Sequence, residues 1–370
     1  MRYLSLIFIL IFNISFLFSQ NTNTGKLDQL LDYANTGNIN GIKRLISAGS
    51  ISSYIDFGDM QGHNALITAT FRGYKDIVVL LLSQKIDVNA TCIHGKTALT
   101  YAAENGYVDI ASYLLAKNAN PNIKVNNGTT ALLQAAGKGY YTITEMIINA
   151  GDDVNMSGLY VNPDDANYNM TPLMVAAYNN HDDIVKLLLD NGSDINKVNN
   201  VGANALFYAI AKGNGEVAKM LLERNADANV VSSYGYYGNI TTLALASSLG
   251  LNDIVSSLLI GKANINYRMA DGRTALIWAS ISGKKDIVLS LINANADVNI
   301  KDNDGKTALM FAAENGDYDS VEYLLDGNAD LNIVDNLSKN ALMYAMENGN
   351  TDIVDLITKK SLVKKWFIKI

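Results

Sequence analysis

Few side chains in this sequence are of a type that carries out covalent or metal chemistry. The chain has three histidines and one cysteine. His63 and His94 are spaced for neighbouring loops, but two imidazoles without a third ligand make a poor metal site, and we interpret both as exposed loop residues. Cys92 has no neighbour other than His94 that would activate its thiol, and His181 is expected at the start of a helix.

Larger catalytic patterns do not stand out either. We find no serine–histidine–aspartate spacing, no glycine-rich loop of the phosphate-binding kind after a predicted strand, and no recurring carboxylate pair outside expected helix starts. The sequence therefore predicts a protein that is not an enzyme, with no catalytic residue, no metal ligand and no cofactor.

The composition narrows the class of protein further. Hydrophobic residues make up 49% of the 370 residues, which is too much for a disordered chain. A single domain rarely grows beyond about 250–300 residues, so we expect either several domains or an elongated repeat array. The net charge of −7 disfavours binding to nucleic acid, and a single cysteine excludes an internal disulfide.

The first residues have the pattern of a targeting segment. Arg2 precedes an apolar stretch of 15 residues, Leu4 to Phe18, which is shorter than the roughly 20 residues of a membrane-spanning helix. We therefore expect residues 1–19 to be a signal peptide and residues 20–26 to be a short linker. The mature chain would be exported, as a periplasmic or secreted protein. An uncleaved membrane anchor is the alternative.

A repeat of 33 residues fills most of the remaining chain. The segment GKTAL that ends at Leu99 returns as GRTAL and again as GKTAL, and its last leucine has equivalents at intervals of 33 residues, apart from two intervals of 41 and 37. A weaker repeat from Leu27 to Ile55 precedes them, which makes ten units. The anchor leucines of the strong repeats are Leu66, Leu99, Leu132, Leu173, Leu206, Leu243, Leu276, Leu309 and Leu342.

The sequence pattern within each repeat predicts two short helices. Thr97 is a suitable N-cap for a helix over residues 98–105, and Gly106 is suited to the left-handed turn that ends it. A second helix is expected from about Val108 to Lys117. In six repeats a glycine or asparagine follows the second helix, as Asn118 does here, and this placement explains part of the 44 asparagines.

These motifs resemble the ankyrin repeat family over about residues 27–360. The resemblance rests on the repeat length, the Thr-Ala-Leu helix start, Ala-Ala-x-x-Gly, and the Ala-Asp-x-Asn turn. It implies an all-α solenoid of stacked helix-turn-helix units with β-hairpin tips. The family's usual Thr-Pro-Leu-His start is kept only as Thr171-Pro172-Leu173, with Met174 in place of histidine. We expect apolar contacts to replace the inter-repeat hydrogen bonds of that histidine.

The resemblance implies a scaffold that binds a protein partner. Combining it with the missing catalytic motifs and the acidic charge, we predict a non-catalytic monomer that does not bind nucleic acid. By family resemblance, the contact surface is the concave helix face together with the hairpin tips, which we place in the central repeats. Tyr178, Leu249 and Ile281 are expected to be exposed on that helix face, where they could form a contact patch.

The two long intervals indicate two extended tips. One contains Tyr160 and Tyr168, and the other contains Tyr234, Tyr236 and Tyr237. Tyrosine mixed with serine, glycine and asparagine is the composition of antibody-like contact loops. These five tyrosines are therefore predicted to bind the partner, whereas a tolerated surface insertion is the alternative.

Other aromatic residues are predicted to belong to the core, because they occupy the position two residues after the anchor leucine. They are Tyr101, Tyr208, Trp278, Phe311 and Tyr344.

The last ten residues, 361–370, are expected to form a basic cap or tail. Leu362, Val363, Trp366 and Ile370 would cover the last repeat while lysines face water. A basic segment that touches anionic lipid is the alternative, and together with the N-terminal segment it gives the only predicted membrane contacts. A second hypothesis for the whole chain is thus a membrane-associated scaffold, or a secreted effector directed at a host, that uses the same repeat surface.

Overall fold

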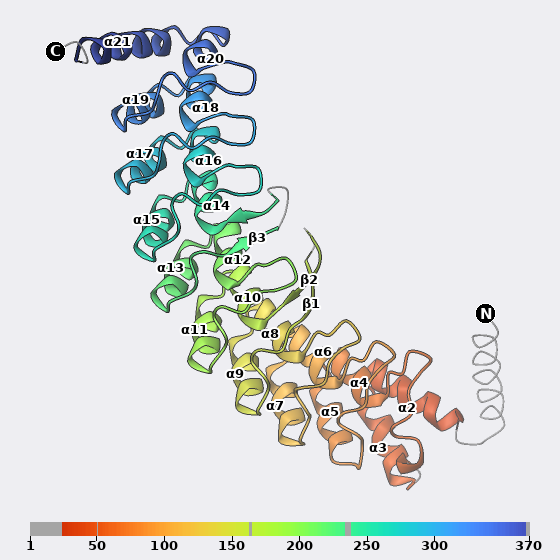
Figure 1. Cartoon of the computed structure of the whole chain (residues 1–370). Coiled ribbons are helices and arrows are strands. Elements are labelled where there is room, and N and C mark those ends of the chain that lie inside the picture. Colours follow the sequence, from red (N-terminus) through yellow and green to blue (C-terminus); the bar gives the residue numbers. More distant parts are fainter. Residues whose placement is uncertain (1–23, 50, 163–164, 234–237, 368–370) are drawn as a thin grey trace, which may run out of the picture. The chain divides into compact units, whose positions relative to one another are not determined.

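The computed structural model describes residues 24–49, 51–162, 165–233 and 238–367. The predicted signal peptide, residues 1–19, lies outside these residues, and so does the tyrosine-rich loop 234–237. The described chain divides into two compact parts: an N-terminal part that ends at Tyr160 and a C-terminal part that begins at Val161. Both parts are mainly helical, with few and short strands (Figure 1).

In the N-terminal part, short helices follow one another in pairs. The first helices α2, α4, α6 and α8 pack side by side in one row, and α3, α5, α7 and α9 form a second row (Figure 1). The first helix begins three residues before Leu27, where the sequence predicts the array to start. The bounds are α2 Thr24–Thr36, α3 Ile39–Ser47, the 3-10 turn Ile51–Ser53, α4 Ala65–Phe71, α5 Lys75–Leu82, α6 Ala98–Asn105, α7 Val108–Ala116, α8 Ala131–Lys138 and α9 Tyr141–Asn149.

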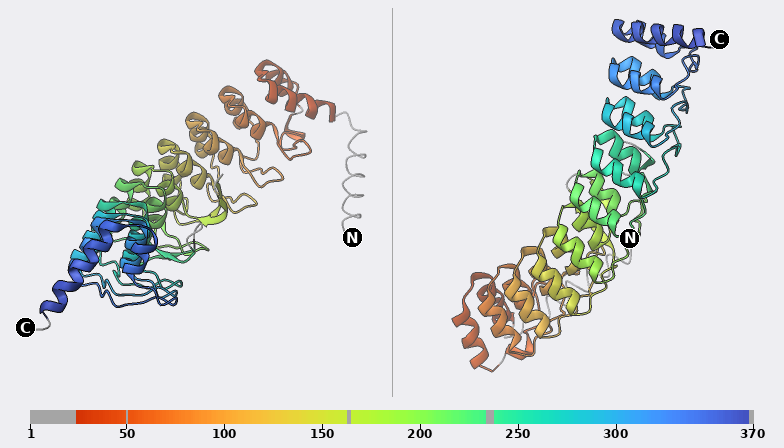
Figure 2. Two further views of the ribbon diagram at one scale, coloured as in Figure 1. Left: turned by 90° about the horizontal axis from the view of Figure 1, so that it is seen from above. Right: turned by 90° about the vertical axis from the view of Figure 1, so that its left-hand side faces the viewer.

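The C-terminal part repeats this arrangement, and Figure 2 shows its two helix rows from two further directions. The bounds of its helices are α10 Pro172–Tyr178, α11 Asp182–Asp190, α12 Ala205–Ala211, α13 Gly215–Glu223, α14 Thr242–Leu249, α15 Asn252–Ile260, α16 Ala275–Ile281, α17 Lys285–Asn293, α18 Ala308–Asn315, α19 Tyr318–Asp326, α20 Ala341–Glu347 and α21 Thr351–Phe367. These helices confirm the predicted helical solenoid of helix-turn-helix repeats.

The two long tips contain the described strands. Strand β1 (Gly158–Asn162) pairs with β2 (Asp165–Met170) in a two-stranded sheet. Strand β3 (Val231–Ser232) pairs with β4 (Ile240–Thr241) antiparallel, with Ser232 opposite Ile240.

The predicted start and end signals of the helices are confirmed. The Thr97 hydroxyl accepts the backbone N–H of Thr100 at 3.1 Å, as an N-cap does, and Gly106 ends α6 with φ +75°. Asn118 likewise has φ +61° after α7. An asparagine at this position tolerates the left-handed conformation better than other residues with a side chain, which explains its repeated use.

Many other asparagines join one repeat to the next. In the C-terminal part, the side-chain oxygen of Asn266 accepts the backbone N–H of Asp297 at 2.9 Å, one repeat further along, and the Asn303 amide donates to the Ala270 carbonyl. The N-terminal part has the same bond between Asn89 and the Asn120 N–H at 2.7 Å. At the histidine position itself, one residue after the anchor leucine, most repeats hold a buried apolar side chain such as Met174, as expected. The amide bonds are a further link between repeats, and they lie at the turns.

The predicted aromatic core residues fall into two groups. Tyr101, Tyr208 and Tyr344 are buried as predicted. Trp278 and Phe311 are only half-buried, which departs from the prediction, and basic side chains lie over both rings.

The C-terminal end differs from its prediction. Helix α21 continues through residue 361 to Phe367, and the Leu362 side chain is 63% exposed, so it does not cover the last repeat. A helix that runs straight on holds residue 362 away from the preceding helix pair. The side chains of Val363, Trp366 and Ile370 lie outside the described part. Among the helices the structure describes, none has the length and apolarity needed to cross a bilayer.

Candidate functional site

Tyr178 is not the exposed contact residue that the sequence predicts. Its side chain is only 8% exposed, and its ring packs edge-on against that of Tyr208, with centroids 5.9 Å apart. The Lys212 ammonium lies 4.6 Å from the Tyr178 ring centroid. The ring is buried because the next repeat offers it an aromatic neighbour and a cation, which a position in the repeat alone does not reveal.

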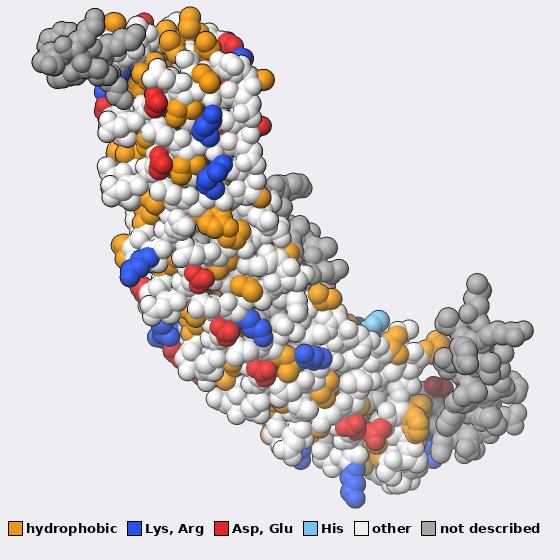
Figure 3. Space-filling view, in the orientation of Figure 1, with side chains coloured by type: hydrophobic (Ala, Val, Ile, Leu, Met, Phe, Trp, Pro, Cys, Tyr) orange, Lys and Arg blue, Asp and Glu red, His pale blue; other side chains and the backbone are white. Residues whose placement is uncertain are grey.

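The two other predicted helix-face residues remain accessible to different degrees. Leu249, at the end of α14, is 39% exposed, and Ile281, at the end of α16, is half-buried. On the face shown in Figure 3, apolar side chains are interspersed with polar ones and do not merge into one broad patch. These two residues therefore add apolar area to a mixed surface.

The second long tip is a fixed support for its tyrosine-rich loop. Its strand β3 is held on the preceding tip, because the Ser233 N–H and the Ser232 hydroxyl both donate to the Val201 carbonyl, at 3.0 and 2.9 Å. Gly202 lies so close that a Cβ there would meet the Val231 oxygen at 2.7 Å. Tyr234, Tyr236 and Tyr237 themselves lie outside the described residues.

The first long tip is attached in a similar way within the N-terminal part. The Leu159 N–H donates to the Asn127 carbonyl at 3.1 Å, and the Thr129 hydroxyl donates to the Leu159 carbonyl at 3.0 Å. Tyr160 belongs to strand β1 and Tyr168 to strand β2. The structure describes the backbone of these two tyrosines but not their side chains.

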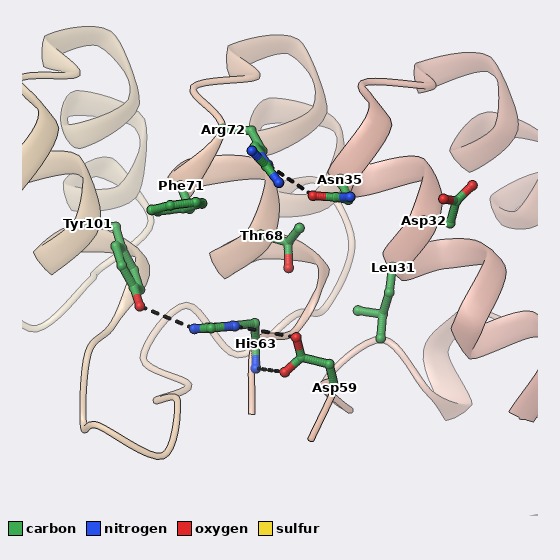
Figure 4. A pocket seen from close by; sticks show the side chains of 9 residues that line it. All are labelled: Leu31, Asp32, Asn35, Asp59, His63, Thr68, Phe71, Arg72 and Tyr101. Atoms are coloured by element: carbon green, nitrogen blue, oxygen red, sulfur yellow. Dashed lines mark hydrogen bonds and ion pairs between the residues drawn. The ribbon is translucent and has the colours of Figure 1, made fainter. Parts of the chain in front are cut away.

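A different set of residues, which the sequence analysis did not single out, surrounds a cavity of about 440 Å³ in the N-terminal part. Figure 4 shows Asp32 and Asp59 towards one side of this cavity, with the rings of Phe71 and Tyr101 on the other. The side chains come from α2, α4, α6 and the tip that precedes α4. The lining residues are Leu31, Asp32, Asn35, Asp59, His63, Thr68, Phe71, Arg72 and Tyr101.

The sequence does contain a signal for this cavity. The position two residues after the anchor leucine holds an aromatic residue in five repeats, including Tyr101. In the second repeat this position holds Thr68, and in the first, two residues after Leu30, it holds Asp32. A small and an acidic side chain thus stand where other repeats place a ring, which leaves space beside Tyr101.

His63 is the polar centre of the cavity wall, and the prediction that it is an exposed loop residue was wrong. Its Nδ1 atom lies 3.4 Å from the Asp59 carboxylate, and its Nε2 atom lies 3.2 Å from the Tyr101 hydroxyl (Figure 4). The repeat stacking causes this, because α6 brings Tyr101 under the preceding tip. His94 is exposed, as predicted.

The phenol and the thiol near His63 are both protected from reaction. The Cys92 sulfur is buried and lies 3.9 Å from the Tyr101 hydroxyl. Burial, followed by the adjacent Cys92, raises the pKa of Tyr101 above its usual value, so the hydroxyl stays protonated at neutral pH. The cavity therefore offers hydrogen-bonding and charged groups, without an activated nucleophile among the side chains that line it.

The C-terminal part shows how this chain fills the equivalent space between repeats. The Arg273 guanidinium lies 5.3 Å from the ring centroid of Trp278 and 5.7 Å from that of Phe311, in the next repeat. The Lys306 ammonium lies 5.0 Å from Phe311 and 4.2 Å from Tyr344. Basic groups and aromatic rings therefore alternate along the helix face of these repeats.

Carboxylates complete each of these clusters. The Arg273 Nε atom lies 3.7 Å from Asp302, and Lys306 pairs with Glu314 at 2.8 Å. Burial alone would raise the pKa of Asp335, but hydrogen bonds from the Tyr344 hydroxyl and from backbone N–H groups hold it below its usual value. Most charges that line the cavity of about 650 Å³ beside Lys306 are thus paired within the chain, as Lys306 is with Glu314 and Lys339 is with Glu347.

Among the residues that the structure describes, no group of three or more histidine, cysteine, aspartate or glutamate side chains is placed to hold a metal ion. Paired helices, left-handed turns and hairpin tips that recur about every 33 residues define a helical repeat protein.

The family is shown by comparison with family models. The model for ankyrin repeats, in three copies, matches residues 30–125, 91–158, 156–232, 235–302 and 291–365. The chain belongs to the ankyrin repeat family. A search among curated proteins found no match. Ankyrin repeats generally mediate protein–protein interaction, and proteins built from them are typically non-catalytic scaffolds.

Proposed function

We propose that this chain is an exported, non-catalytic scaffold of ten ankyrin repeats that binds a protein partner. The partner would contact the extended hairpin tips and the neighbouring concave helix face of the central repeats. The observation that carries this proposal is the anchored ribbon of β3 and β4, which presents a loop with three tyrosines.

Two physical arguments support this surface. Tyrosine supplies a large contact area with little conformational freedom to lose, and a support that is hydrogen-bonded to the preceding tip lowers the entropy lost when the loop binds. Leu249 and Ile281 would extend the same contact with apolar area at the ends of α14 and α16. Tyr178 is left out of this surface, because its ring is buried.

Export is part of the proposal and rests on the sequence of residues 1–19 alone. The basic residue followed by a short apolar stretch supports a signal peptide. Sequencing the N-terminus of the protein from cells is the test. A start near Gln20 agrees with export, whereas an intact Met1 with the chain in the membrane fraction favours the membrane-associated scaffold.

The contact surface is tested by replacing tyrosines in matched groups. One variant changes Tyr234, Tyr236 and Tyr237 to serine. The control variant changes three exposed tyrosines of the second-helix row to serine, namely Tyr113, Tyr141 and Tyr318. Each variant is used to recover partners from cell envelope and culture medium.

The proposal predicts that a protein recovered with the parent and with the control variant is lost with the loop variant. Loss by both variants would indicate a general surface effect. Equal recovery by all three chains would overturn the assignment to the loop.

A further inference from the structure

Between its first two repeats, the N-terminal part lacks the kind of cation that fills the C-terminal repeats. There, the residue three positions before the anchor leucine is Arg273, Lys306 or Lys339, and each lies over the ring of its own repeat. Arg273 and Lys306 also reach the ring of the following repeat. The third repeat follows the same rule with Lys96 over Tyr101, and the second repeat holds His63 at this position. In the first repeat, Leu27 holds that position before Leu30, so the chain supplies no cation there.

The anionic partners of such a cation are nevertheless present. Asp59 stands seven residues before its anchor leucine, as Asp302 does, and Asp302 is the carboxylate that lies near Arg273 of the preceding repeat. Asp32 adds a second, exposed carboxylate from α2 to the cavity lining. The place between the first two repeats thus keeps the acidic group and lacks the lysine or arginine of the C-terminal repeats, with only the His63 ring beside Asp59.

The space and its walls suit a guanidinium group. Thr68 and Asp32 leave room where other repeats have rings, and the half-exposed ring of Phe71 forms an apolar wall on the opposite side (Figure 4). Guanidinium groups combine well with carboxylates and with aromatic faces, because their planar shape allows both contacts at once.

Two basic side chains already lie in the cavity wall, and neither takes the place of Arg273. The His63 Nδ1 atom lies 3.4 Å from the Asp59 carboxylate, and Arg72 points to an amide. The Arg72 Nε atom donates to the Asn35 side-chain oxygen at 2.9 Å, and its guanidinium lies 5.6 Å from the Phe71 ring centroid. Its described partner is therefore an amide and not an acid. The Asp59 carboxylate is held in place by the backbone N–H groups of Gln61 and His63, at 2.8 and 2.9 Å, which fixes its direction at the cavity wall.

We propose that this cavity is a binding site for an arginine side chain of a protein partner. The guanidinium would take the place between the first two repeats that Arg273 takes in the C-terminal repeats. Asp32 and Asp59 would provide the charge, and Phe71 would provide the apolar face. This site lies on the N-terminal repeats, so it is independent of the tyrosine-rich tips proposed above.

The test uses capped single amino acids as probes. N-acetyl-arginine methylamide is titrated into the full chain, and backbone amide shifts of His63 and Thr68 are followed by NMR. N-acetyl-citrulline methylamide has nearly the same shape without the charge, and N-acetyl-glutamate methylamide tests whether Arg72 selects an acidic ligand instead. None of these probes depends on the tip tyrosines, so this experiment and the tip experiment can fail separately.

Three variants locate the site. Thr68→Tyr fills the cavity with the residue that other repeats carry at this position, and is expected to abolish arginine binding while the chain stays folded. Asp32→Asn and Asp59→Asn are each expected to weaken binding about two- to fivefold, as partly exposed ion pairs do. Asp28→Asn, on the same helix but outside the cavity lining, is the matched control and is expected to bind as the parent does.

Saturable shifts with arginine, at least fivefold weaker shifts with citrulline, and loss in Thr68→Tyr would support the site. Equal binding of citrulline, tighter binding of glutamate, or unchanged binding in Thr68→Tyr would overturn it. An absence of saturable shifts with arginine up to about 50 mM would overturn it as well, since that limit corresponds to less than about 2 kcal/mol of binding free energy.

Discussion

A buried carboxylate at the end of α9 makes the N-terminal part less stable at neutral pH. Asp152 is only 8% exposed, and no donor reaches either of its oxygens in a well-formed hydrogen bond. Burial raises its pKa from 3.8 to about 7, and the nearby N–H of Asp153 offsets only part of this effect. Other repeats hold a small residue at this position, such as Ala119 and Ala296.

The magnitude follows from the shift. A rise of about three pKa units corresponds to about 4 kcal/mol as an upper bound, at about 1.4 kcal/mol per unit. Because the folded-state pKa is raised, the protonated form is the one that the fold tolerates. The penalty is absent below about pH 4, grows as the pH rises from 4 to 7, and stays constant above pH 7. Asp152→Ala should therefore stabilise the protein by about 2–4 kcal/mol at pH 8 and by much less at pH 4.

Urea unfolding followed by circular dichroism at pH 4, 6 and 8 measures this difference. Amide hydrogen exchange in α9 should show the same pH-dependent difference between the parent and Asp152→Ala. A local probe is needed because repeat arrays can unfold in steps. Asp152→Asn keeps the shape of the side chain and should show the same trend, whereas the exposed Asp28→Asn should follow the parent. A stability difference for Asp152→Ala that does not change between pH 4 and pH 8 would refute the reasoning.

Two further changes test the turns. Gly106→Ala places a Cβ in a left-handed turn and 2.7 Å from the Tyr140 ring, whereas Gly213→Ala has the same backbone strain with nothing within 4 Å. Urea titrations should therefore show a loss of about 1–2 kcal/mol for Gly213→Ala and a larger loss for Gly106→Ala, and equal losses would exclude the steric contribution. Asn266→Ala removes an inter-repeat bond to the Asp297 N–H and should lower the unfolding free energy by about 1 kcal/mol, and no measurable loss would show that water replaces this bond.

The regular features of the fold could be predicted from the sequence because they are local. An N-cap such as Thr97 and a left-handed glycine such as Gly106 are defined by a few neighbouring residues and by backbone geometry. The 33-residue period then specifies that the helix pairs stack. No distant contact is needed for these steps.

The errors arose where the next repeat decides the outcome. Tyr178 is buried because Tyr208 and Lys212 approach from the following repeat, and the sequence position alone suggested exposure. The asparagine bonds between repeats were missed for the same reason, since their acceptors and donors lie about 31 to 33 residues away.

The N-terminal cavity was missed because it results from residues that are small or acidic rather than from a motif. Neither Thr68 nor Asp32 is unusual by itself. That they leave a cavity becomes clear only by comparison with the aromatic rings at the equivalent position of other repeats. A comparison of one repeat position along the whole chain would have found it.

Site-specific crosslinking tests the central claim most directly. A photoreactive benzoylphenylalanine replaces Tyr236 in the tyrosine-rich loop, or Tyr318 on the second-helix row as a control, and cells are irradiated before envelope and medium are separated. We expect a crosslinked protein partner from position 236 and none from position 318. Adducts from position 318 alone, or the same adducts from both positions, would contradict binding through the extended tip.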